Sequence, residues 1–395
     1  GRGLRLHPEK ECLTVLDFIG AQRREFRFAS RFRALSGKPT AKIDDEIQAS
    51  FPHLPSGCVI KLERVAQQRV LENVRESIRL VRPRMLSALR DLKQYLGRTP
   101  TIQDAVEYFD TSLDELLKRG LWSRLLADAG LGETVEAPDE VQLAKGLSRI
   151  SHINCPIQIK ALADYLATPE ANGTNQNSAW IEMLQASLWG TAYSGMTFDE
   201  AKRRLWANPT AIKDLQAVLE FRLKSAFSNH GGTASMYDPL RVHAAYTRDE
   251  ILIALGHWSF SDRPSQREGV LQLKNRKCDL LFVTLQKSED EYSPTTMYED
   301  YLVSQDLFHW QSQSNTSEQS PTGQRYIRHH EFGYTPLLFV RETKNLPSGI
   351  SAPYHFLGPC RYVQHTGSRP ISITWKLDCP VPTRLLRSMA RQIAV

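Results

Sequence analysis

From Lys61 to about Phe227, apolar residues recur with the period of an α-helix. At the start of this stretch the repeating apolar positions, with arginines between them, are Leu62, Val65, Val70, Val74 and Ile78. This pattern predicts amphipathic helices that bury one side. Capping-box patterns at Ser112–Glu115 and Thr197–Glu200 and an Asn208–Pro209 step predict helix starts. Gly120 and Gly130 stand where helices would end.

After about residue 245 the pattern becomes that of strands. Asp279–Leu285 and Pro336–Glu342 are apolar runs, and from Ile371 to Leu377 apolar residues alternate with polar ones. A capping-box pattern at Thr247–Glu250 predicts one helix before them, ending at Gly256. The fold class expected is therefore α+β, a helical domain followed by a mainly β, barrel-like domain.

Composition shifts and loop-rich stretches divide the chain further. We expect five parts: an N-terminal segment at 1–38, a linker at 39–60, a helical domain at 61–228, a second linker at 229–245 and a β-rich domain at 246–395. Within the helical domain, Thr99 to Gly130 has the rhythm of a helix-turn-helix unit. Such a unit enters a DNA groove in some proteins and is an ordinary packing unit in others, and the residues leave both interpretations open.

Composition excludes several classes of protein. The chain of 395 residues is 41% hydrophobic and 24% charged with a net charge of +6, which fits a globular protein and permits a polyanionic partner. No run approaches the roughly 20 apolar residues that a membrane-spanning helix needs, and the N-terminus is no signal peptide. The six cysteines form no C-x-x-C pair. We therefore expect a cytoplasmic protein with reduced thiols, no membrane segment and no metal site.

The residues from Tyr292 to Gly323 are unusually rich in aromatic rings beside amides and hydroxyls. A pocket for an extruded base needs that mixture, rings for stacking and polar groups for the base edge. The candidate base-binding residues are Tyr292, Tyr298, Phe308, Trp310, Gln311 and Gln313. The same residues would equally suit the core and edge of a β-rich domain. Ser368 and Arg369 are candidates for a phosphate contact, although Arg369 would also suit an edge strand.

No complete active site is evident. The chain lacks the phosphate-binding G-x-x-x-x-G-K-[ST] loop, the G-x-S-x-G elbow and the H-E-x-x-H zinc motif. Its first residues, Gly1 to Arg5, fit the second half of the Q-x-x-G-R-x-x-R signature of superfamily 2 helicases. The guanidinium groups of Arg2 and Arg5 would suit the charge on a transferred γ-phosphoryl group. A flexible Gly-Arg tail would look the same.

Five segments together carry a family resemblance: 246–252 (YTRDEIL), 292–298 (YSPTTMY), 307–314 (LFHWQSQS), 320–323 (SPTG) and 367–375 (GSRPISITW). They resemble the C-terminal region of type IV, modification-dependent restriction enzymes that are built on a superfamily 2 helicase. The resemblance spans nearly the whole chain and is most specific in its last 150 or so residues. In that family a phospholipase-D-like nuclease precedes the motor, and a helical coupler and a target-recognition domain follow it.

The resemblance implies a function for each part: residues 1–38 would be the end of the motor domain, 61–228 the helical coupler and 246–395 the target-recognition domain. Arg2 and Arg5 would be nucleotide-sensing arginines of the motor, positioned by Gly1, and ATP and Mg²⁺ would serve the full-length hydrolase rather than this fragment. The last domain, similar to the base-flipping SRA type, would recognise 5-methyl- or 5-hydroxymethylcytosine in double-stranded DNA during phage defence. Helicase and nuclease domains of the same polypeptide and a second copy of the chain are the further partners expected. Two alternatives remain: a helicase accessory module that binds DNA without reading its modification, and a protein-interaction module.

Overall fold

The computed structural model describes residues 82–109, 111–133, 138–168, 178–190, 195–226, 237–263, 268–286 and 300–389, and the single residues Ile47, Ile60 and Gln67. The chain divides into two compact units, Gly1–Arg84 and Met85–Val395. In the first unit the side-chain amide of Gln67 donates to the carbonyl of buried Ile47 over 2.7 Å. The predicted motor segment at 1–38 lies outside the described residues, as does nearly all of the predicted linker at 39–60.

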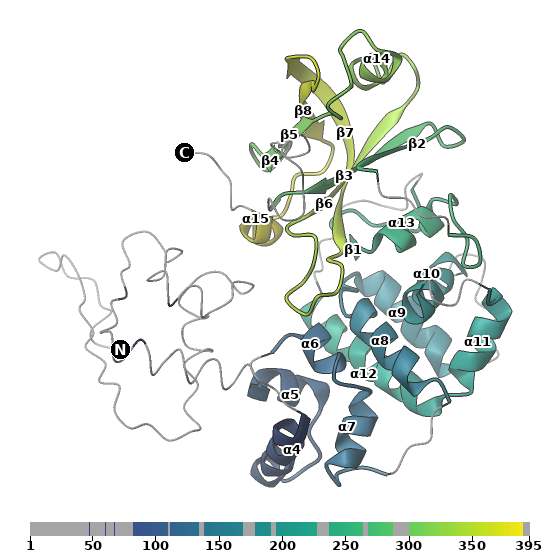
Figure 1. Ribbon diagram of the computed structural model, residues 1–395, viewed down its shortest axis with the longest axis vertical. Coiled ribbons are helices and arrows are strands. Elements are labelled where there is room, and N and C mark those ends of the chain that lie inside the picture. The colour runs from purple at the N-terminus through teal and green to yellow at the C-terminus, as the bar shows by residue number, and fades with distance from the viewer. Residues whose placement is uncertain are drawn as a thin grey trace, which may run out of the picture. The chain divides into compact units, whose positions relative to one another are not determined.

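The helical prediction for the middle of the chain is confirmed over the described residues. The helices are α4 (Arg82–Leu96), α5 (Ile102–Phe109), α6 (Leu113–Leu117), α7 (Trp122–Asp128), α8 (Glu140–Ile150), α9 (Pro156–Ala167), α10 (Ser178–Trp189), α11 (Phe198–Trp206) and α12 (Pro209–Ser225) (Figure 1). Helix α10 is buried at nearly every residue from Trp180 to Trp189. It packs against α8, α9, α11 and α13.

The predicted helix starts are formed by the expected hydrogen bonds. The hydroxyls of Ser112 and Thr197 accept from the backbone N–H groups of Glu115 and Glu200. These caps satisfy N–H groups that the first turn of a helix leaves without partners. Asn208 precedes Pro209 at the start of α12, but its side chain forms no capping bond.

The rest of the second unit is built from strands with a few short helices. Its elements are β1 (Ala245–Tyr246), α13 (Arg248–Ala254), β2 (Val270–Leu273), β3 (Cys278–Thr284), β4 (Tyr301–Leu302), β5 (Leu307–Gln311), α14 (Pro321–Ile327), β6 (Thr335–Arg341), β7 (Tyr354–Thr366), β8 (Ser372–Leu377) and α15 (Thr383–Met389). The predicted strands at 279–285, 336–342 and 371–377 are thus confirmed to within a residue or two. The molecule is α+β.

The described strands form one mixed sheet of eight strands in the order β2-β3-β6-β7-β8-β5-β4, with β1 paired to β7 off this path. β3 and β6 are parallel, and the other pairs are antiparallel. In the described part of the chain the end strands β2 and β4 do not pair, so the expected barrel is not closed there. Strand β7 lies near the middle of the order and is shared between two groups of strands.

Strand β7 changes partners along its length. Its first half, Tyr354–Pro359, pairs with β1 and β6, and its second half, Cys360–Thr366, pairs with β8. Gly358 lies at this change with φ +97°, and a Cβ atom there would come within 3.3 Å of the Val242 side chain. A glycine permits both the conformation and the close approach. The strand thereby divides the sheet into half-sheet A (β1, β2, β3, β6 and the first half of β7) and half-sheet B (the second half of β7, β8, β5 and β4).

A single apolar core lies between the two half-sheets. Half-sheet A contributes residues such as Leu281 and Val340, and half-sheet B contributes Phe308, Trp310 and Trp375. Helix α14 closes the core with Tyr326, and its Arg325 forms an ion pair over 2.9 Å with Asp279, a fully buried residue of β3. These residues are what the alternating pattern of the strands would bury.

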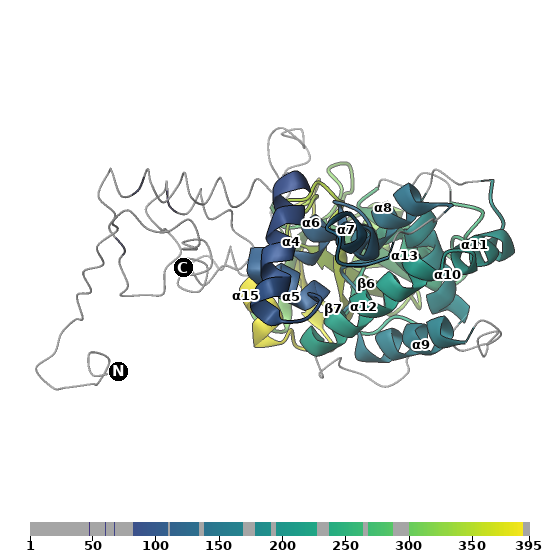
Figure 2. The ribbon, with the colours of Figure 1, turned by 90° about the horizontal axis from the view of Figure 1, so that it is seen from below.

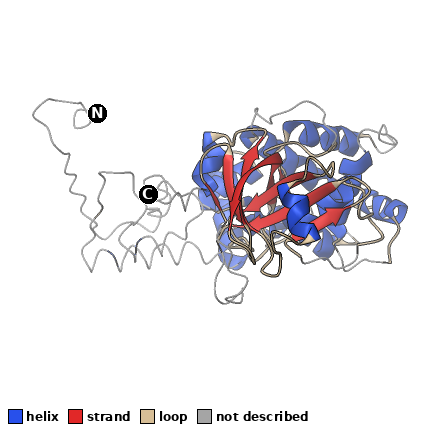
Figure 3. Cartoon of the chain, turned by 90° about the horizontal axis from the view of Figure 1, so that it is seen from above, coloured by secondary structure: helices blue, strands red, loops and turns tan. Residues whose placement is uncertain are grey.

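The other face of half-sheet A is covered as well. Phe339 stacks on Phe282 at 5.3 Å and on Phe356 at 4.7 Å between ring centroids. The guanidinium of Arg248, from α13, lies 4.1 Å from the centroid of Phe282. Most of the helices lie to one side of the sheet (Figures 2 and 3). Half-sheet A is therefore an inner layer with both faces packed.

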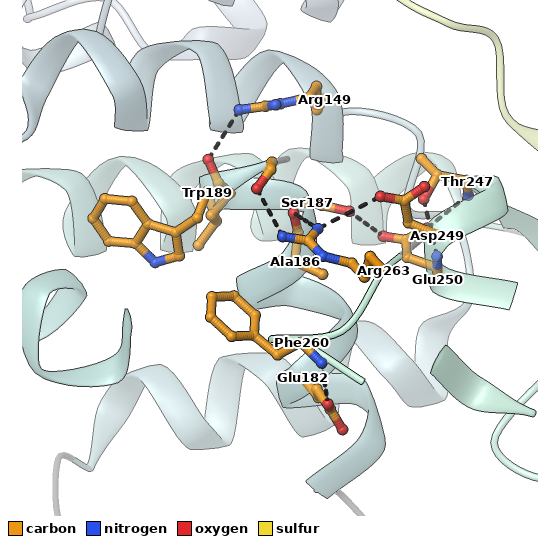
Figure 4. A network of polar contacts seen from close by, with 12 residues as sticks. Arg149, Glu182, Ala186, Ser187, Trp189, Thr247, Asp249, Glu250, Phe260 and Arg263 are labelled. Carbon is orange, nitrogen blue, oxygen red and sulfur yellow. Dashed lines mark hydrogen bonds and ion pairs between the residues drawn. The ribbon is translucent and has the colours of Figure 1, made fainter. Parts of the chain in front are cut away.

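Buried polar contacts join α13, which follows β1, to the helices before it (Figure 4). Glu250 of α13 accepts hydrogen bonds from the Ser187 hydroxyl (2.9 Å) and the Thr247 backbone N–H (2.7 Å), and its carboxylate lies 2.8 Å from Nε2 of His152. Burial by itself raises the pKa of this carboxyl, but the charge and hydrogen bond of His152, together with the hydrogen bonds from Thr247 and Ser187, outweigh burial and the pKa is lowered. Glu250 therefore fixes α13 to α10 and to the segment that follows α8.

Two long side chains complete this junction at the end of α10. Arg263 donates to the carbonyls of Ala186 (3.1 Å) and Gly190 (2.7 Å), and Gln142 donates to that of Leu188 over 2.9 Å. The last carbonyls of a helix have no partners within it and carry partial negative charge, which a guanidinium satisfies. Residues after 237 thus form part of the same compact unit as the helices.

Candidate nucleic-acid interface

The structure places the predicted site residues in three different settings. Arg2, Arg5, Tyr292 and Tyr298 lie outside the described residues. Phe308 and Trp310 are in the core, where Phe308 is fully buried and Trp310 is 3% exposed. Trp310 packs edge-on against Tyr326 at 5.4 Å. For these two aromatic residues the burial favours packing over a contact with a base, because neither ring offers a free face.

The polar candidates lie near the surface instead. Gln311 donates from its side chain to the Ser372 hydroxyl over 3.2 Å, which links β5 to β8. The side-chain oxygen of Gln313 accepts from the hydroxyls of Thr316 and Tyr326, each over 3.3 Å. Gln313 therefore holds the loop after β5 against α14.

The loop at 312–320 is also tied to the turn between β7 and β8. The Ser368 hydroxyl accepts from the backbone N–H of Glu318 (3.3 Å), and the N–H of Arg369 donates to the Thr316 carbonyl (3.2 Å). Arg369 has a left-handed backbone, with φ 64°, and its side chain is exposed. The structure thus brings Gln311, Gln313, Ser368 and Arg369 to the same end of half-sheet B.

A hydrogen-bonded pair lies beside this turn. The Tyr362 hydroxyl is 2.6 Å from Nδ1 of His365, and Nε2 of His365 is 3.6 Å from a carboxylate oxygen of Glu318. Burial and, second, the charge of Glu318 raise the pKa of the Tyr362 hydroxyl. These contacts hold the end of β7 to the loop that carries Glu318.

The feature that stands out is the outward face of half-sheet B. Residues directly opposite one another on paired strands point to the same side, and the inward side is marked by Phe308, Trp310, Ile373 and Trp375. The outward positions define what we term the polar face: Tyr301, His309, Gln311, Arg361, Gln364, Thr366, Ser372, Thr374 and Lys376. Every one of these side chains is half-buried or exposed. Leu307, which is opposite Lys376, is an apolar residue on the same side of the strands.

The polar face is organised in rows across the strands. Gln311, Ser372 and Thr366 form one row, and His309, Thr374 and Gln364 form the next. Lys376 and Arg361 stand opposite each other in a third row beside Leu307. Amides, hydroxyls, an imidazole and two cations thus lie on one continuous surface.

Charge on this surface has one sign. The spans of β4, β5, β8 and the second half of β7 contain no aspartate or glutamate. Acidic residues lie at its margins: Asp378 pairs with Arg361 over 2.8 Å, Asp306 precedes β5, and Asp300 accepts from the backbone N–H of Gln311. The face therefore suits a negatively charged ligand.

An aromatic stack stands at the edge of the polar face. The rings of Tyr301 and His309 are 4.6 Å apart and nearly parallel, with an interplanar angle of 15°. β4 ends the strand order, so the far side of the Tyr301 ring meets no further strand among the described residues. A planar group could extend the stack there.

Two other classes of site find no support in the described part of the chain. There, no cluster of three or more histidine, cysteine, aspartate or glutamate side chains is arranged to hold a metal ion. None of the described helices combines the length and apolar composition that crossing a bilayer requires.

The sequence predicted about half of the residues of the polar face and did not predict the others. The alternation in β8 pointed Ser372, Thr374 and Lys376 outward, but Arg361, Gln364 and Thr366 showed no clean alternation. The register of β7 on β8 shifts between Tyr362 and Gln364, which disturbs the period of two. The polar residues between Arg361 and Thr366 were the available signal.

Comparison with known proteins covers the β part of the chain. A search of curated proteins gives no match. Residues 240–389 match a protein family described as a domain of unknown function, DUF3427. The matched region begins just before β1 and ends with α15, so it contains both half-sheets, α13 and the polar face.

Proposed function

We propose that residues 240–389 bind DNA through the polar face of half-sheet B. The observation that carries the proposal is that polar and cationic side chains occupy one face of strands whose other face forms the core. It presents hydrogen-bonding groups and two cations on four adjacent strands that contain no acidic residue, while the opposite side of the same strands forms the core. Protein groups of these kinds contact the phosphates and base edges of nucleic acids.

Within this proposal the DNA contact serves a larger ATP-driven enzyme of the cytoplasm. By the family resemblance, the domain reads 5-methyl- or 5-hydroxymethylcytosine and the helical part couples that reading to a superfamily 2 helicase motor and a nuclease. The motor, with Arg2 and Arg5, would use ATP and Mg²⁺. A base-flipping pocket and an SRA-like barrel are the finer parts of the same proposal.

A buried methyl group gives a physical reason for the coupling. Burying one methyl contributes about 0.8 kcal/mol, and a pocket discriminates one methylene by roughly 10–200-fold. Such discrimination is small beside the excess of unmodified cytosines in a genome. A motor that adds further steps between recognition and cleavage would increase selectivity.

A second candidate is a helicase accessory module that binds DNA without reading modification. The burial of Phe308 and Trp310 favours it, because those rings were the expected walls of a base pocket. In this candidate the polar face still contacts DNA, but the domain does not recognise a modified base.

Fluorescence anisotropy of the full chain with short duplexes distinguishes the two. One duplex carries a single 5-methylcytosine and its twin carries none, both at near-physiological salt. The full chain is needed because Glu250 and Arg263 join the β part to the helices. Tighter binding of the methylated duplex supports the reader, and equal binding supports the accessory module.

Substitutions on the polar face test whether this surface is responsible for the DNA binding that anisotropy measures. Lys376→Glu should weaken DNA binding, whereas Lys274→Glu, at an exposed lysine of the β2–β3 turn, should not. If the folded wild-type chain bound neither duplex nor a single strand of the same sequence, both candidates would be contradicted and a protein partner would be the next hypothesis.

A further inference from the structure

The width of the polar face bears on the kind of DNA that it fits. Neighbouring strands are about 4.8 Å apart, so the axes of four strands span about 14 Å before side chains are added. The major groove of B-DNA is about 12 Å wide and admits an α-helix or a two-stranded ribbon. Four paired strands, β4, β5, β8 and the second half of β7, are therefore too broad to reach base edges in a duplex groove.

The chemistry of the face suits bases that are already exposed. A sheet recognises single strands by stacking unpaired bases on aromatic rings and bonding their edges with polar side chains. The Tyr301–His309 stack provides such a ring at the sheet edge. The rows through Thr374 and Ser372, on β8, provide hydroxyl and amide groups about 10 Å from this edge, two strand spacings away.

Two cations of the polar face suit the phosphates of a single strand. Lys376 and Arg361 stand side by side across β8 and β7, and Arg361 is 63% exposed at its side chain despite its pair with Asp378. Phosphates of a strand whose bases turn toward the sheet would run along such positions. A single strand with splayed bases can meet the stacking ring, the polar rows and the cations together, which a closed duplex cannot.

We propose that the polar face binds a single-stranded segment of DNA with its bases unstacked, of the kind that a DNA-separating motor exposes. This inference rests on the proposed function and specifies its substrate. Tyr301 stacks on one base, Gln364 and Thr374 contact base edges, and Lys376 contacts a phosphate. Recognition of a modified cytosine then takes place on a separated strand.

The test compares a labelled 12-nucleotide single strand with the blunt duplex of the same sequence, by anisotropy with the full chain. The single strand should bind at least about tenfold more tightly, since one stacked base alone accounts for about that factor. Equal or tighter binding of the duplex overturns the inference and leaves the proposed function standing. Absence of binding to both forms overturns the proposed function as well.

Variants locate the contact. Tyr301→Ala should weaken single-strand binding about 5- to 10-fold and leave the duplex unchanged. Tyr95→Ala removes a tyrosine that is 86% exposed on α4 and is the matched control, expected to change neither affinity. Tyr301→Phe keeps the ring and should bind like the wild type.

An independent variant guards against a folding defect at Tyr301. Gln364 is exposed on β7, so Gln364→Ala should leave thermal unfolding unchanged and still reduce single-strand affinity about threefold. A single-strand preference that survives both Tyr301→Ala and Gln364→Ala would overturn the assignment to this face.

Discussion

The two halves of strand β7 have opposite surroundings. From Tyr354 to Cys360 its residues are buried or half-buried, between the core on one side and a layer of stacked phenylalanines on the other. From Arg361 to Thr366 the strand is mostly exposed and carries part of the polar face. One continuous strand thus serves as inner scaffold at one end and as open surface at the other.

The comparison shows that strand formation and burial have separate causes. Both halves of β7 are held by backbone hydrogen bonds to neighbouring strands. The two halves differ in the face that points away from the core. In half-sheet A this face carries the stacked rings of Phe282, Phe339 and Phe356, and α13 packs on it, whereas in half-sheet B it carries polar side chains. The polar residues gathered on the outward face of half-sheet B are the surface that we propose for DNA binding.

The largest effect is expected where the scaffold holds a buried charge. Asp279→Ala should destabilise the protein by about 2–3 kcal/mol, because it empties a fully buried position and leaves the half-buried Arg325 without its carboxylate partner. Urea unfolding measures the change. A loss of less than about 1 kcal/mol would mean that half-sheet A does not depend on this pair.

The two histidines of β7 give the next contrast. Burial and the neighbouring charges lower the pKa of His355, in the first half, to about 4. An unfolded histidine takes up a proton near pH 6.5, so stability is full at neutral pH and falls as the pH drops from 6.5 towards 4. A pKa shift of this size corresponds to a loss of about 3 kcal/mol in the free energy of unfolding. Because the residue is partly exposed, we expect a loss of about 2 kcal/mol.

Unfolding of variants across pH 4 to 7 checks this assignment. His355→Gln should flatten the acid limb of the stability curve, and His365→Gln, at the open end of the strand, should leave that limb in place. An unchanged curve in His355→Gln would show that another group controls the acid response.

A smaller effect is expected for DNA binding at the open half. Lys376→Ala should weaken DNA binding by about 1 kcal/mol and lower the slope of log affinity against log salt by about 1, as the loss of one phosphate contact requires. Lys274→Ala is the matched control. Equal slopes in the two variants would remove Lys376 from the interface.

The smallest effect is expected for stability at the open half. Arg361→Ala breaks an exposed ion pair with Asp378, and such pairs contribute about 0–1 kcal/mol. Its unfolding should therefore nearly coincide with that of the wild type, in contrast to Asp279→Ala. A loss comparable with that of Asp279→Ala would mean that half-sheet B is buried in the working state.

Local signals in the sequence predicted the elements well. The helix period placed the helices between Arg82 and Ser225, Thr247 and Glu250 formed the predicted capping box, and the apolar run at 279–285 became β3. These features depend on residues that are close together in the sequence, and for that reason the pattern of the sequence alone predicts them.

The arrangement of the sheet depended on contacts between distant segments. Nothing near Gly358 in the sequence shows that β7 leaves β6 for β8, and the described strands form an open sheet in which no barrel closure is seen. The same limit affected the candidate site. Phe308 and Trp310 had the residue types of a base pocket, but their inward positions follow from pairing with β8.

Hydrogen–deuterium exchange of the full chain with and without a 12-nucleotide single strand tests the central claim most directly. The account predicts protection of the polar-face strands, at 361–366 and 372–376, with exchange at 278–284 and 335–341 unchanged. Protection confined to half-sheet A or the helices, or none at saturating DNA, would contradict the assignment of the polar face as the DNA interface.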